Sequence, residues 1–252
     1  MGSPDLYDEI ASLYHLIYAD WEGSIRRQAA ALQGVLQEEL GPGPWSVLDV
    51  SCGIGTQSLG LAGLGHEVTA ADVSKASVRR AMQEARRRGL AIDFSVGDMR
   101  TCHERYDRRF DVVLSGDNAV PHLLTDADLL SAFRSFLACT RPGGVCLITV
   151  RDYEQESRDP TQFRPFGVRD TDTGRCLVFQ TWDFDGDHYD LGQYFLQERE
   201  GRAPRVTVGR SRYYAVGIAK LIALLAEAGF HAPRRIDGRF FQPILLGRRP
   251  EA

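Results

Sequence analysis

Short apolar runs alternate along the middle of the chain with segments whose apolar residues recur at helical spacing. The runs lie at 46–50, 66–72, 92–99, 110–116 and 145–150 and are rich in valine, leucine and isoleucine. Runs of this length are typical of buried parallel strands, and the segments between them are typical of helices. Because strand and helix alternate with short connections, the sequence predicts right-handed βαβ units and an α/β fold with a doubly wound parallel sheet.

The N-terminal segment from Leu6 to Trp21 is compatible with a helix and is rich in aromatic residues. Tyr7, Tyr14, Tyr18 and Trp21 follow one another at spacings of seven, four and three, which would place them along one stripe of that helix. A second helix is predicted from about 22 to 40. The stripe is either a packing face or the inner side of a lid that closes over ligands.

The part of the chain after the parallel strands has a different pattern. Residues 177–182, 189–198 and 206–216 alternate between apolar and polar positions and predict three antiparallel strands. A helix is expected over 217–228, followed by a closing hairpin of 233–237 with 241–247. We expect the antiparallel strands to cover the carboxyl ends of the parallel ones, where substrate selection takes place.

A glycine-rich turn follows the first strand. Asp49 ends the apolar run, and Gly53 and Gly55 allow a sharp turn that a ligand can approach closely. The turn leads into a helix, so free backbone N–H groups face an anionic or polar ligand group. The third glycine of the dinucleotide-binding fingerprint is absent, because Ser58 stands in its place.

Acidic residues end the next two strands. Asp72 lies beside the glycine turn in a doubly wound sheet, where it can accept hydrogen bonds from two ribose hydroxyls. Asp98 precedes Met99, so that a carboxylate able to receive the exocyclic amine of adenine stands beside an apolar wall.

Together these features resemble the class I S-adenosylmethionine-dependent methyltransferases from about residue 45 to 150. The resemblance rests on Asp-x-x-x-Gly-x-Gly at 49–55, on Asp72, on Gly-Asp-Met at 97–99, on Phe-Asp-Val-Val-Leu at 110–114 and on Arg-Pro-Gly-Gly at 141–144. The segments 7–21 and 117–123 resemble, more narrowly, the bacterial glycine/sarcosine N-methyltransferase-like enzymes.

The resemblance implies a Rossmann-like, doubly wound, seven-stranded sheet that is mostly parallel, with its last strand antiparallel. It divides the chain into a helical lid (1–44), a cofactor-binding core (45–150), a small antiparallel β insertion that acts as a substrate lid (151–216), and the last helix and hairpin of the core (217–252). The implied cofactor is S-adenosyl-L-methionine, with S-adenosyl-L-homocysteine as product.

Site residues are assigned in three groups. The cofactor-binding residues are expected to be Asp49, Gly53, Gly55, Asp72, Asp98, Met99, Ser115, Asn118, Tyr7, Trp21 and Arg27. His122 is the expected general base, with Tyr14 as a second catalytic residue. Substrate contacts are expected from Tyr18, Arg151, Tyr153, Tyr194 and Tyr213.

Composition limits the partners. The chain has 252 residues and a formal net charge of −4, so we expect no basic surface for a nucleic-acid backbone. No apolar stretch reaches the length of a membrane span. Five cysteines without C-x-x-C spacing predict reduced thiols and a cytoplasmic location. The expected partner is a small-molecule substrate, and the sequence is compatible with a homo-oligomer.

Other functions fit less well. A nicotinamide dehydrogenase is disfavoured by the missing glycine and by the absence of a Tyr-x-x-x-Lys pair. A nucleic-acid amino-methyltransferase would carry Asn/Asp-Pro-Pro-Tyr after the fourth strand, and this segment is missing. A metal-dependent enzyme would need a cluster of acidic ligands, which the sequence does not show, so no metal is predicted. The sequence therefore predicts in-line methyl transfer to a small-molecule amine. A hydroxyl or carboxylate of a natural-product scaffold is the alternative acceptor, and a non-catalytic S-adenosylmethionine-binding protein is the alternative from another class.

Overall fold

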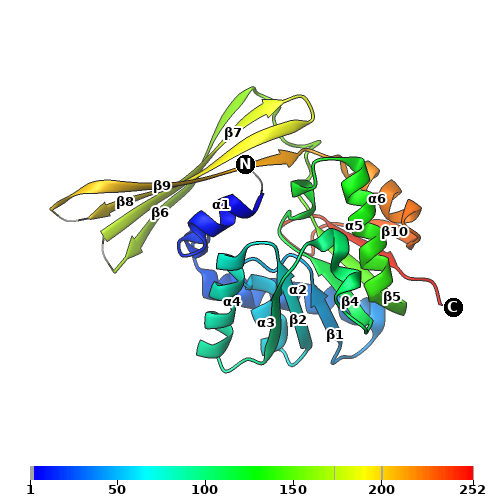
Figure 1. The fold of residues 1–252 in the computed structure, drawn as a ribbon. Coiled ribbons are helices and arrows are strands. Elements are labelled where there is room, and N and C mark those ends of the chain that lie inside the picture. Colours follow the sequence, from blue (N-terminus) through cyan, green and yellow to red (C-terminus); the bar gives the residue numbers. More distant parts are fainter. Residues whose placement is uncertain (1–2, 173, 200, 252) are drawn as a thin grey trace.

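The computed structural model describes residues 3–172, 174–199 and 201–251, which form two separate β-sheets with helices around the larger one (Figure 1). The larger sheet has seven strands: β1 (Ser46–Asp49), β2 (Glu67–Asp72), β3 (Ile92–Val96), β4 (Phe110–Ser115), β5 (Thr140–Thr149), β10 (His231–Ile236) and β11 (Ile244–Arg248). Their order is β10-β11-β5-β4-β1-β2-β3, and β1 to β5 pair in parallel. Only β11 runs antiparallel to both neighbours, so the predicted seven-stranded sheet with its last strand antiparallel is confirmed.

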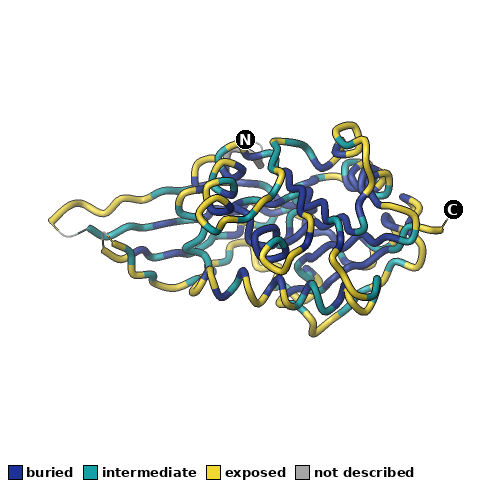
Figure 2. The backbone as a smooth tube through the Cα atoms, turned by 90° about the horizontal axis from the view of Figure 1, so that it is seen from below, coloured by how far each residue is buried: buried dark blue, intermediate teal, exposed yellow. Residues whose placement is uncertain are grey.

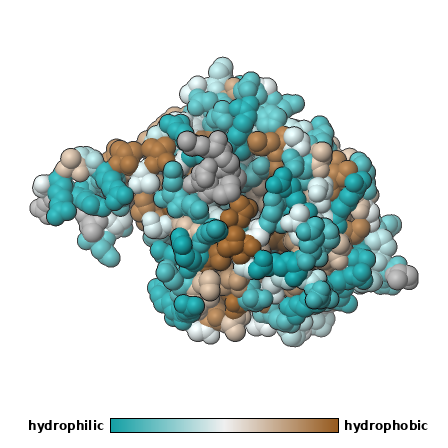
Figure 3. Space-filling view, in the orientation of Figure 1, coloured by the Kyte–Doolittle hydropathy of each residue, from teal (hydrophilic) through white to brown (hydrophobic). Residues whose placement is uncertain are grey.

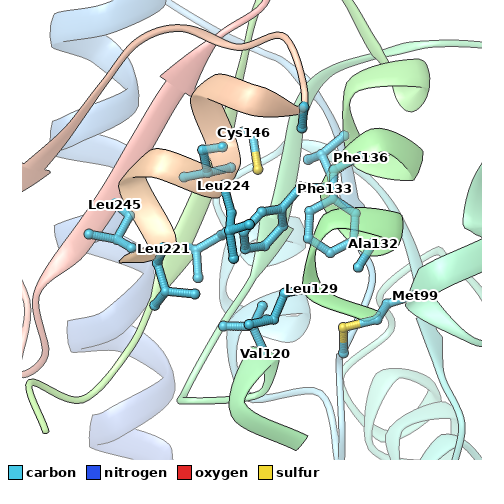
Figure 4. Packing of buried hydrophobic residues seen from close by; sticks show 14 of the residues in the cluster. Met99, Val120, Leu129, Ala132, Phe133, Phe136, Cys146, Leu221, Leu224 and Leu245 are labelled. Carbon is cyan, nitrogen blue, oxygen red and sulfur yellow. The ribbon is translucent and has the colours of Figure 1, made fainter. Parts of the chain in front are cut away.

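Helices cover both faces of this sheet because successive strand residues point to opposite sides. Leu48 and Val113 belong to a core that includes α5 (Asp126–Cys139) and α6 (Ile218–Glu227), and Figure 4 shows the phenylalanines of α5 packed beside the leucines of α6. Val47 and Val112 face the other side, where they join residues of α2 (Trp21–Leu40). Two further helices, α3 (Thr56–Gly63) and α4 (Lys75–Arg87), follow β1 and β2. The side chains of Ser74 and Thr125 cap α4 and α5.

The N-terminal segment does not form one continuous helix, so the prediction of a single aromatic stripe was wrong. Helix α1 (Ser3–Ile10) ends, a short 3₁₀ helix η1 (Tyr14–Ile17) follows, and α2 starts at Trp21. The break has a local cause, because the side chain of Asp20 accepts a hydrogen bond from the backbone N–H of Gly23 and starts a new helix. Tyr7, Tyr14 and Tyr18 therefore come from three pieces of chain.

The smaller sheet is an antiparallel meander of β6 (Thr161–Thr171), β7 (Gly174–Asp185), β8 (His188–Arg199) and β9 (Arg202–Tyr214). Strands β7 to β9 match the three predicted strands, whereas β6 was missed. Its sequence is polar and contains Pro165 and Gly167, where the pairing with β7 shifts register. Both features weaken the strand pattern.

Helix α1 lies between the smaller sheet and the rest of the molecule (Figure 1). Leu6 and Ile10 pack against Val178 and Phe195 of that sheet. Exposed residues gather toward the end of the sheet that points away from the core (Figure 2), and apolar side chains remain on its surface (Figure 3). Within the described ranges, no helix is both long and apolar enough to cross a membrane.

Candidate active site

A cavity of about 370 Å³ opens at the carboxyl ends of β1 to β4. This is the edge at which open α/β sheets bind ligands, and the volume suits a small molecule. Its walls are residues 50–54, 56–57, 72–74, 98–100, 116–117, 119, 122–124 and 128, together with Tyr7, Tyr14 and Tyr18. We refer to it as the first cavity.

The glycine turn leaves room for a ligand where the sequence predicted it. Gly53 lines the first cavity with φ of 52°, and a Cβ at this position would meet no atom within 4 Å. Gly55 has φ of 94°, but its missing Cβ would lie 3.2 Å from Ala81. Gly53 thus gives the ligand access, whereas Gly55 lets the turn pack against α4 without lining the cavity.

Asp72 connects the end of β2 to the glycine turn. Its carboxylate accepts hydrogen bonds from the backbone N–H groups of Gly53 at 2.8 Å and Ser74 at 2.9 Å. Burial raises the pKa of Asp72, while these hydrogen bonds oppose the rise. A carboxylate has about four acceptor positions, so Asp72 keeps capacity for ligand hydroxyls on the wall of the first cavity.

Asp98 and Met99 also line the first cavity, as expected. Both oxygens of Asp98 are held by the guanidinium of Arg100, which also binds Asp128. The Asp98 carboxylate is thereby fixed beside the apolar Met99 side chain.

Two predicted cofactor residues lie behind the cavity wall. The buried Asp49 accepts hydrogen bonds from the hydroxyl of Ser58 at 2.6 Å and from the backbone of Ser51 at 3.3 Å. The hydroxyl of Ser115 lies 3.0 Å from that of Ser51. Asp49 and Ser115 therefore hold the glycine turn in place and do not line the cavity.

The buried Asp49 gives a test of this arrangement. Burial raises the pKa of Asp49 to about 7, from about 3.9 in an unfolded chain. The folded state therefore binds the proton more tightly, and this group lowers the free energy of unfolding as pH rises from about 4 to about 7. We expect Asp49→Asn to remove this decline, as measured by urea unfolding between about pH 4 and 8.

Asp111 serves as a control, because its effect on the free energy of unfolding should change with pH in the opposite direction. Burial alone would raise its pKa, but hydrogen bonds from Ser46 and the charge of Arg141 hold the pKa below the usual value. Asp111→Asn should therefore remove stability that is present at neutral pH and lost at low pH. An Asp49→Asn variant with the same pH dependence as the unmodified protein would contradict the assignment.

A second cavity of about 560 Å³ adjoins the first. Four residues line both cavities: Tyr7, Tyr14, Tyr18 and Asp117. The remaining walls are Ile17, Ser24, Arg27, Gln28, Ala31, Asn118, Arg151, Phe166, Gln180, Leu191, Tyr213 and 238–241. The N-terminal segment, the end of β4 and the smaller sheet thus enclose one space in two parts.

Asp117 stands at the junction of the two cavities. Its backbone has φ of 53°, and its N–H donates to the hydroxyl of Thr149 at 2.7 Å. Its carboxylate accepts a hydrogen bond from the Tyr18 hydroxyl at 2.9 Å. Burial raises its pKa, and the charge of Arg151 opposes that rise. The sequence interpretation gave Asp117 no role, although its position directly after the fourth strand was an available signal.

His122 is half-buried and lies in a network of hydroxyl groups. Its Nε2 lies 2.9 Å from the hydroxyl of Tyr7 and its Nδ1 lies 3.2 Å from that of Ser211. The Tyr7 hydroxyl also lies 3.1 Å from that of Tyr213. Burial lowers the pKa of His122 to about 3, so the ring is neutral at neutral pH.

Comparison with known proteins agrees with this geometry. Residues 47–144 match the methyltransferase domain family. The chain is 25% identical over 135 residues to a glycine/sarcosine N-methyltransferase of Halorhodospira halochloris, covering 54% of this chain and 49% of the relative. It is 31% identical over 149 residues to the dTDP-3-amino-3,6-dideoxy-alpha-D-glucopyranose N,N-dimethyltransferase of Streptomyces fradiae, covering 57% and 54%. Residues 47–144 therefore form a methyltransferase domain.

The chain spans about half the length of these curated relatives. Among solved structures, DesVI of Streptomyces venezuelae superposes with a TM-score of 0.82 at 21% identity, covering 95% of this chain and 98% of the other, which shows a shared fold. S-adenosyl-L-methionine is the cofactor of this methyltransferase family. Open space at Gly53 and the half-buried carboxylate of Asp72 on one wall fit its ribose end.

Several residues lie elsewhere than the sequence interpretation placed them. Trp21 was expected at the cofactor, but its Nε1 donates to Thr56 at 2.9 Å and its ring packs in the core beside the first cavity. Tyr194 was expected at the substrate, but its ring stacks on Phe179 at 4.7 Å, and neither cavity includes it. Both assignments are corrected here.

Other predicted residues are near the cavities but in different roles. Arg27 and Asn118 line the second cavity and not the first. Tyr153 lines neither, because its hydroxyl accepts from Asn118 at 2.8 Å and lies 3.0 Å from that of Tyr189. Arg151 and Tyr213 line the second cavity.

Proposed function

We propose that this protein transfers a methyl group from S-adenosyl-L-methionine to an amine nitrogen of a small molecule that occupies the second cavity. The observation that carries the proposal is the shared wall, because Asp117 and three tyrosines border both cavities at one junction. Two of the relatives are, by name, N-methyltransferases, one of glycine and sarcosine and one of an amino sugar nucleotide. A half-buried carboxylate at the junction also favours a cationic acceptor over a neutral one.

The residues act mainly by positioning. The cofactor, when bound, supplies a methyl group that its sulfonium already activates. Tyr7, Tyr14 and Tyr18 hold the two ligands in adjoining spaces and exclude water from the junction. Bringing donor and acceptor to attack distance corresponds to an effective molarity of about 10⁵–10⁸ M, so little covalent assistance is required.

An amine acceptor must lose a proton before its lone pair can attack. We assign this proton to the carboxylate of Asp117, which lines both cavities. Among the described residues, its side chain accepts hydrogen bonds only from Tyr18 and, at 3.4 Å, from Gln242. Because the pKa of Asp117 is raised, it lies closer to the pKa of an amine than the pKa of an ordinary carboxylate does.

His122, the base that the sequence suggested, has less capacity for this step. Both of its ring nitrogens are engaged by hydroxyl groups, and its lowered pKa makes it a weak proton acceptor. We propose that His122 positions Tyr7 instead. His122→Gln, which can still hydrogen-bond to Tyr7, should then lower kcat by less than about 10-fold, whereas loss of a general base costs about 10²–10⁴-fold.

The measurement for His122 is kcat against pH for the unmodified and variant enzymes, with His122→Ala beside it. A positioning role predicts a larger loss for alanine than for glutamine and no recovery at high pH. A loss of about 10²-fold or more in both variants that shrinks at high pH would restore His122 as the base.

The proposed function is tested with methyl-labelled cofactor and matched acceptor pairs. An amino sugar and the parent sugar with a hydroxyl at the same carbon differ only at the acceptor atom. We expect label transfer and S-adenosyl-L-homocysteine formation with amines and none with the matched hydroxyl compounds. Transfer to hydroxyls alone would establish the O-methyltransferase alternative, and cofactor binding without transfer to any acceptor would favour a non-catalytic role.

A further inference from the structure

Two buried thiols lie next to each other outside both cavities. Cys102 belongs to the 3₁₀ helix η2 (Met99–Glu104), and Cys139 is the last residue of α5. Their sulfur atoms are 3.7 Å apart, although the residues lie 37 positions apart in the sequence. A disulfide holds its sulfurs at about 2.05 Å, so an approach of about 1.7 Å would join them. Among the described residues, no other two cysteines make such a contact.

Cys102 has a route by which its proton can reach the surface. Its sulfur lies 3.1 Å from the hydroxyl oxygen of the buried Ser135, and that oxygen lies 2.9 Å from Nδ1 of His103. The backbone N–H of His103 also donates to this oxygen, at 3.1 Å. Ser135 can therefore accept the thiol proton while it donates its own proton to the exposed His103. The thiolate that remains is the nucleophilic form of cysteine.

The two thiols differ in acidity. The hydrogen bond between the sulfurs lowers the pKa of Cys102, although burial opposes that change. The same hydrogen bond raises the pKa of Cys139, and burial adds to the rise. Cys102 is therefore the thiol that reacts first, and Cys139 is placed to react with the product.

A small cavity gives access to Cys102. It has a volume of about 270 Å³, and its walls include Cys102 and the exposed residues Thr101, Glu104 and Arg105. A water molecule takes up about 30 Å³, so the cavity can admit a molecule as small as hydrogen peroxide. Cys139 does not line it, so an entering oxidant meets Cys102 first.

The chain around Cys102 also forms part of the first cavity. Val50, Asp98 and Met99 line both the first cavity and the small one. Met99 is the first residue of η2 and packs in the same core as residues of α5 (Figure 4). Drawing Cys102 toward Cys139 would therefore displace η2 and, with it, the wall that Asp98 and Met99 provide for the cofactor.

We infer that Cys102 and Cys139 are a redox-active pair, which a hydroperoxide converts to a disulfide that weakens cofactor binding in the first cavity. This inference goes beyond the proposed function and does not depend on which acceptor is methylated. Its chemical class of oxidant is a hydroperoxide, because the small cavity leads to a single thiol that can lose its proton.

The reaction has two steps. The Cys102 thiolate attacks one peroxide oxygen, the O–O bond breaks, and the other oxygen leaves with the proton that Cys102 gave up, so that Cys102 becomes a sulfenic acid. The sulfur of Cys139 then attacks the sulfur of Cys102, the S–S bond forms, and the hydroxyl leaves as water with the proton of Cys139. Two thiols are oxidised and one hydroperoxide is reduced to water and an alcohol, or to two waters from hydrogen peroxide.

The first experiment identifies the bond directly in the full-length protein. The reduced protein is treated with a small excess of hydrogen peroxide, alkylated, digested and analysed by mass spectrometry. We expect a cross-linked peptide pair that contains Cys102 and Cys139 and that dithiothreitol separates. The pair should be absent from Cys102→Ser and Cys139→Ser and retained in Cys146→Ser, which replaces another buried cysteine of the same core. Absence of this pair from the unmodified protein, or faster oxidation of another cysteine, would overturn the inference.

Ser135→Ala tests the route of the proton. The variant keeps both thiols and removes the hydroxyl between Cys102 and His103, so the disulfide should form about 10-fold more slowly. Ser131→Ala is the control, because Ser131 is an exposed serine of the same helix α5. Melting temperatures show whether each variant is folded. Equal rates in the two serine variants would contradict the assigned route.

The second experiment connects the disulfide to the cofactor. S-adenosyl-L-homocysteine is titrated into reduced, oxidised and re-reduced protein. We expect oxidation to weaken binding about 5-fold or more, reduction to restore it, and Cys102→Ser to keep its affinity after peroxide treatment. Because such coupling is reciprocal, saturating S-adenosyl-L-homocysteine should also disfavour the disulfide in a thiol redox buffer. Equal affinities of the oxidised and reduced proteins, with the disulfide present, would overturn the inferred effect on the cofactor.

Discussion

Asp117→Asn is expected to lower kcat for an amine acceptor by about 10²–10⁴-fold while leaving cofactor binding nearly intact. The substitution keeps the size of the side chain and removes its ability to accept a proton. Because the carboxylate borders both cavities, the substitution should slow the methyl-transfer step rather than weaken the binding of either ligand alone. The measurement is single-turnover transfer of labelled methyl at saturating concentrations of both ligands.

The pH profile makes this expectation more specific. Asp117 must be ionised to accept a proton, so activity should fall as pH drops through its raised pKa, and this acid limb should disappear in the asparagine variant. Asp128→Asn serves as control, because Asp128 lines the first cavity but pairs with Arg100 away from the junction. If both asparagine variants kept the kcat of the unmodified enzyme, Asp117 would have no part in proton removal.

Asp72→Ala is expected to weaken binding of S-adenosyl-L-methionine by about 1.5–3 kcal/mol, roughly 10- to 100-fold. The structure gives two reasons for an effect of this size. The substitution removes acceptors for ribose hydroxyls, and it also leaves the backbone N–H groups of Gly53 and Ser74 without their partner. The shape of the glycine turn and the ligand contact would be lost together.

Calorimetric titration of S-adenosyl-L-methionine and S-adenosyl-L-homocysteine measures the effect. Asp93→Ala is the control, since Asp93 is an exposed carboxylate on the neighbouring strand β3, outside both cavities. NAD should show no binding to the unmodified protein. An unchanged dissociation constant in Asp72→Ala would remove the ribose assignment, and saturable binding of NAD would contradict the assigned cofactor.

The sheet could be predicted from the sequence because its signals are local. Each parallel strand is one apolar run, and the turn after β1 and the end of β2 carry Gly53 and Asp72 within the same units. Two βαβ units placed side by side are enough to bring these residues together. The first cavity was therefore predictable before any long-range contact was known.

The second cavity was less predictable because distant elements form it. Tyr194 and Tyr213 lie on neighbouring antiparallel strands, and only the register and the burial of each face decide which of them reaches the cavity. Both faces of the smaller sheet carry apolar residues, so alternation alone could not select Tyr213. The place of Asp117 in the site likewise depends on its hydrogen bond with Tyr18, which lies 99 positions away in the sequence.

The three tyrosines that line both cavities would also affect how one nitrogen receives two methyl groups in succession. On the proposed function, spent cofactor must leave the first cavity before a fresh molecule enters, and Tyr7, Tyr14 and Tyr18 line that cavity as well as the one assigned to the acceptor. A movement of these tyrosines that released one ligand would loosen the hold on the other. The singly methylated intermediate would then escape in competition with its second methylation, so that the ratio of mono- to dimethylated product would depend on acceptor concentration.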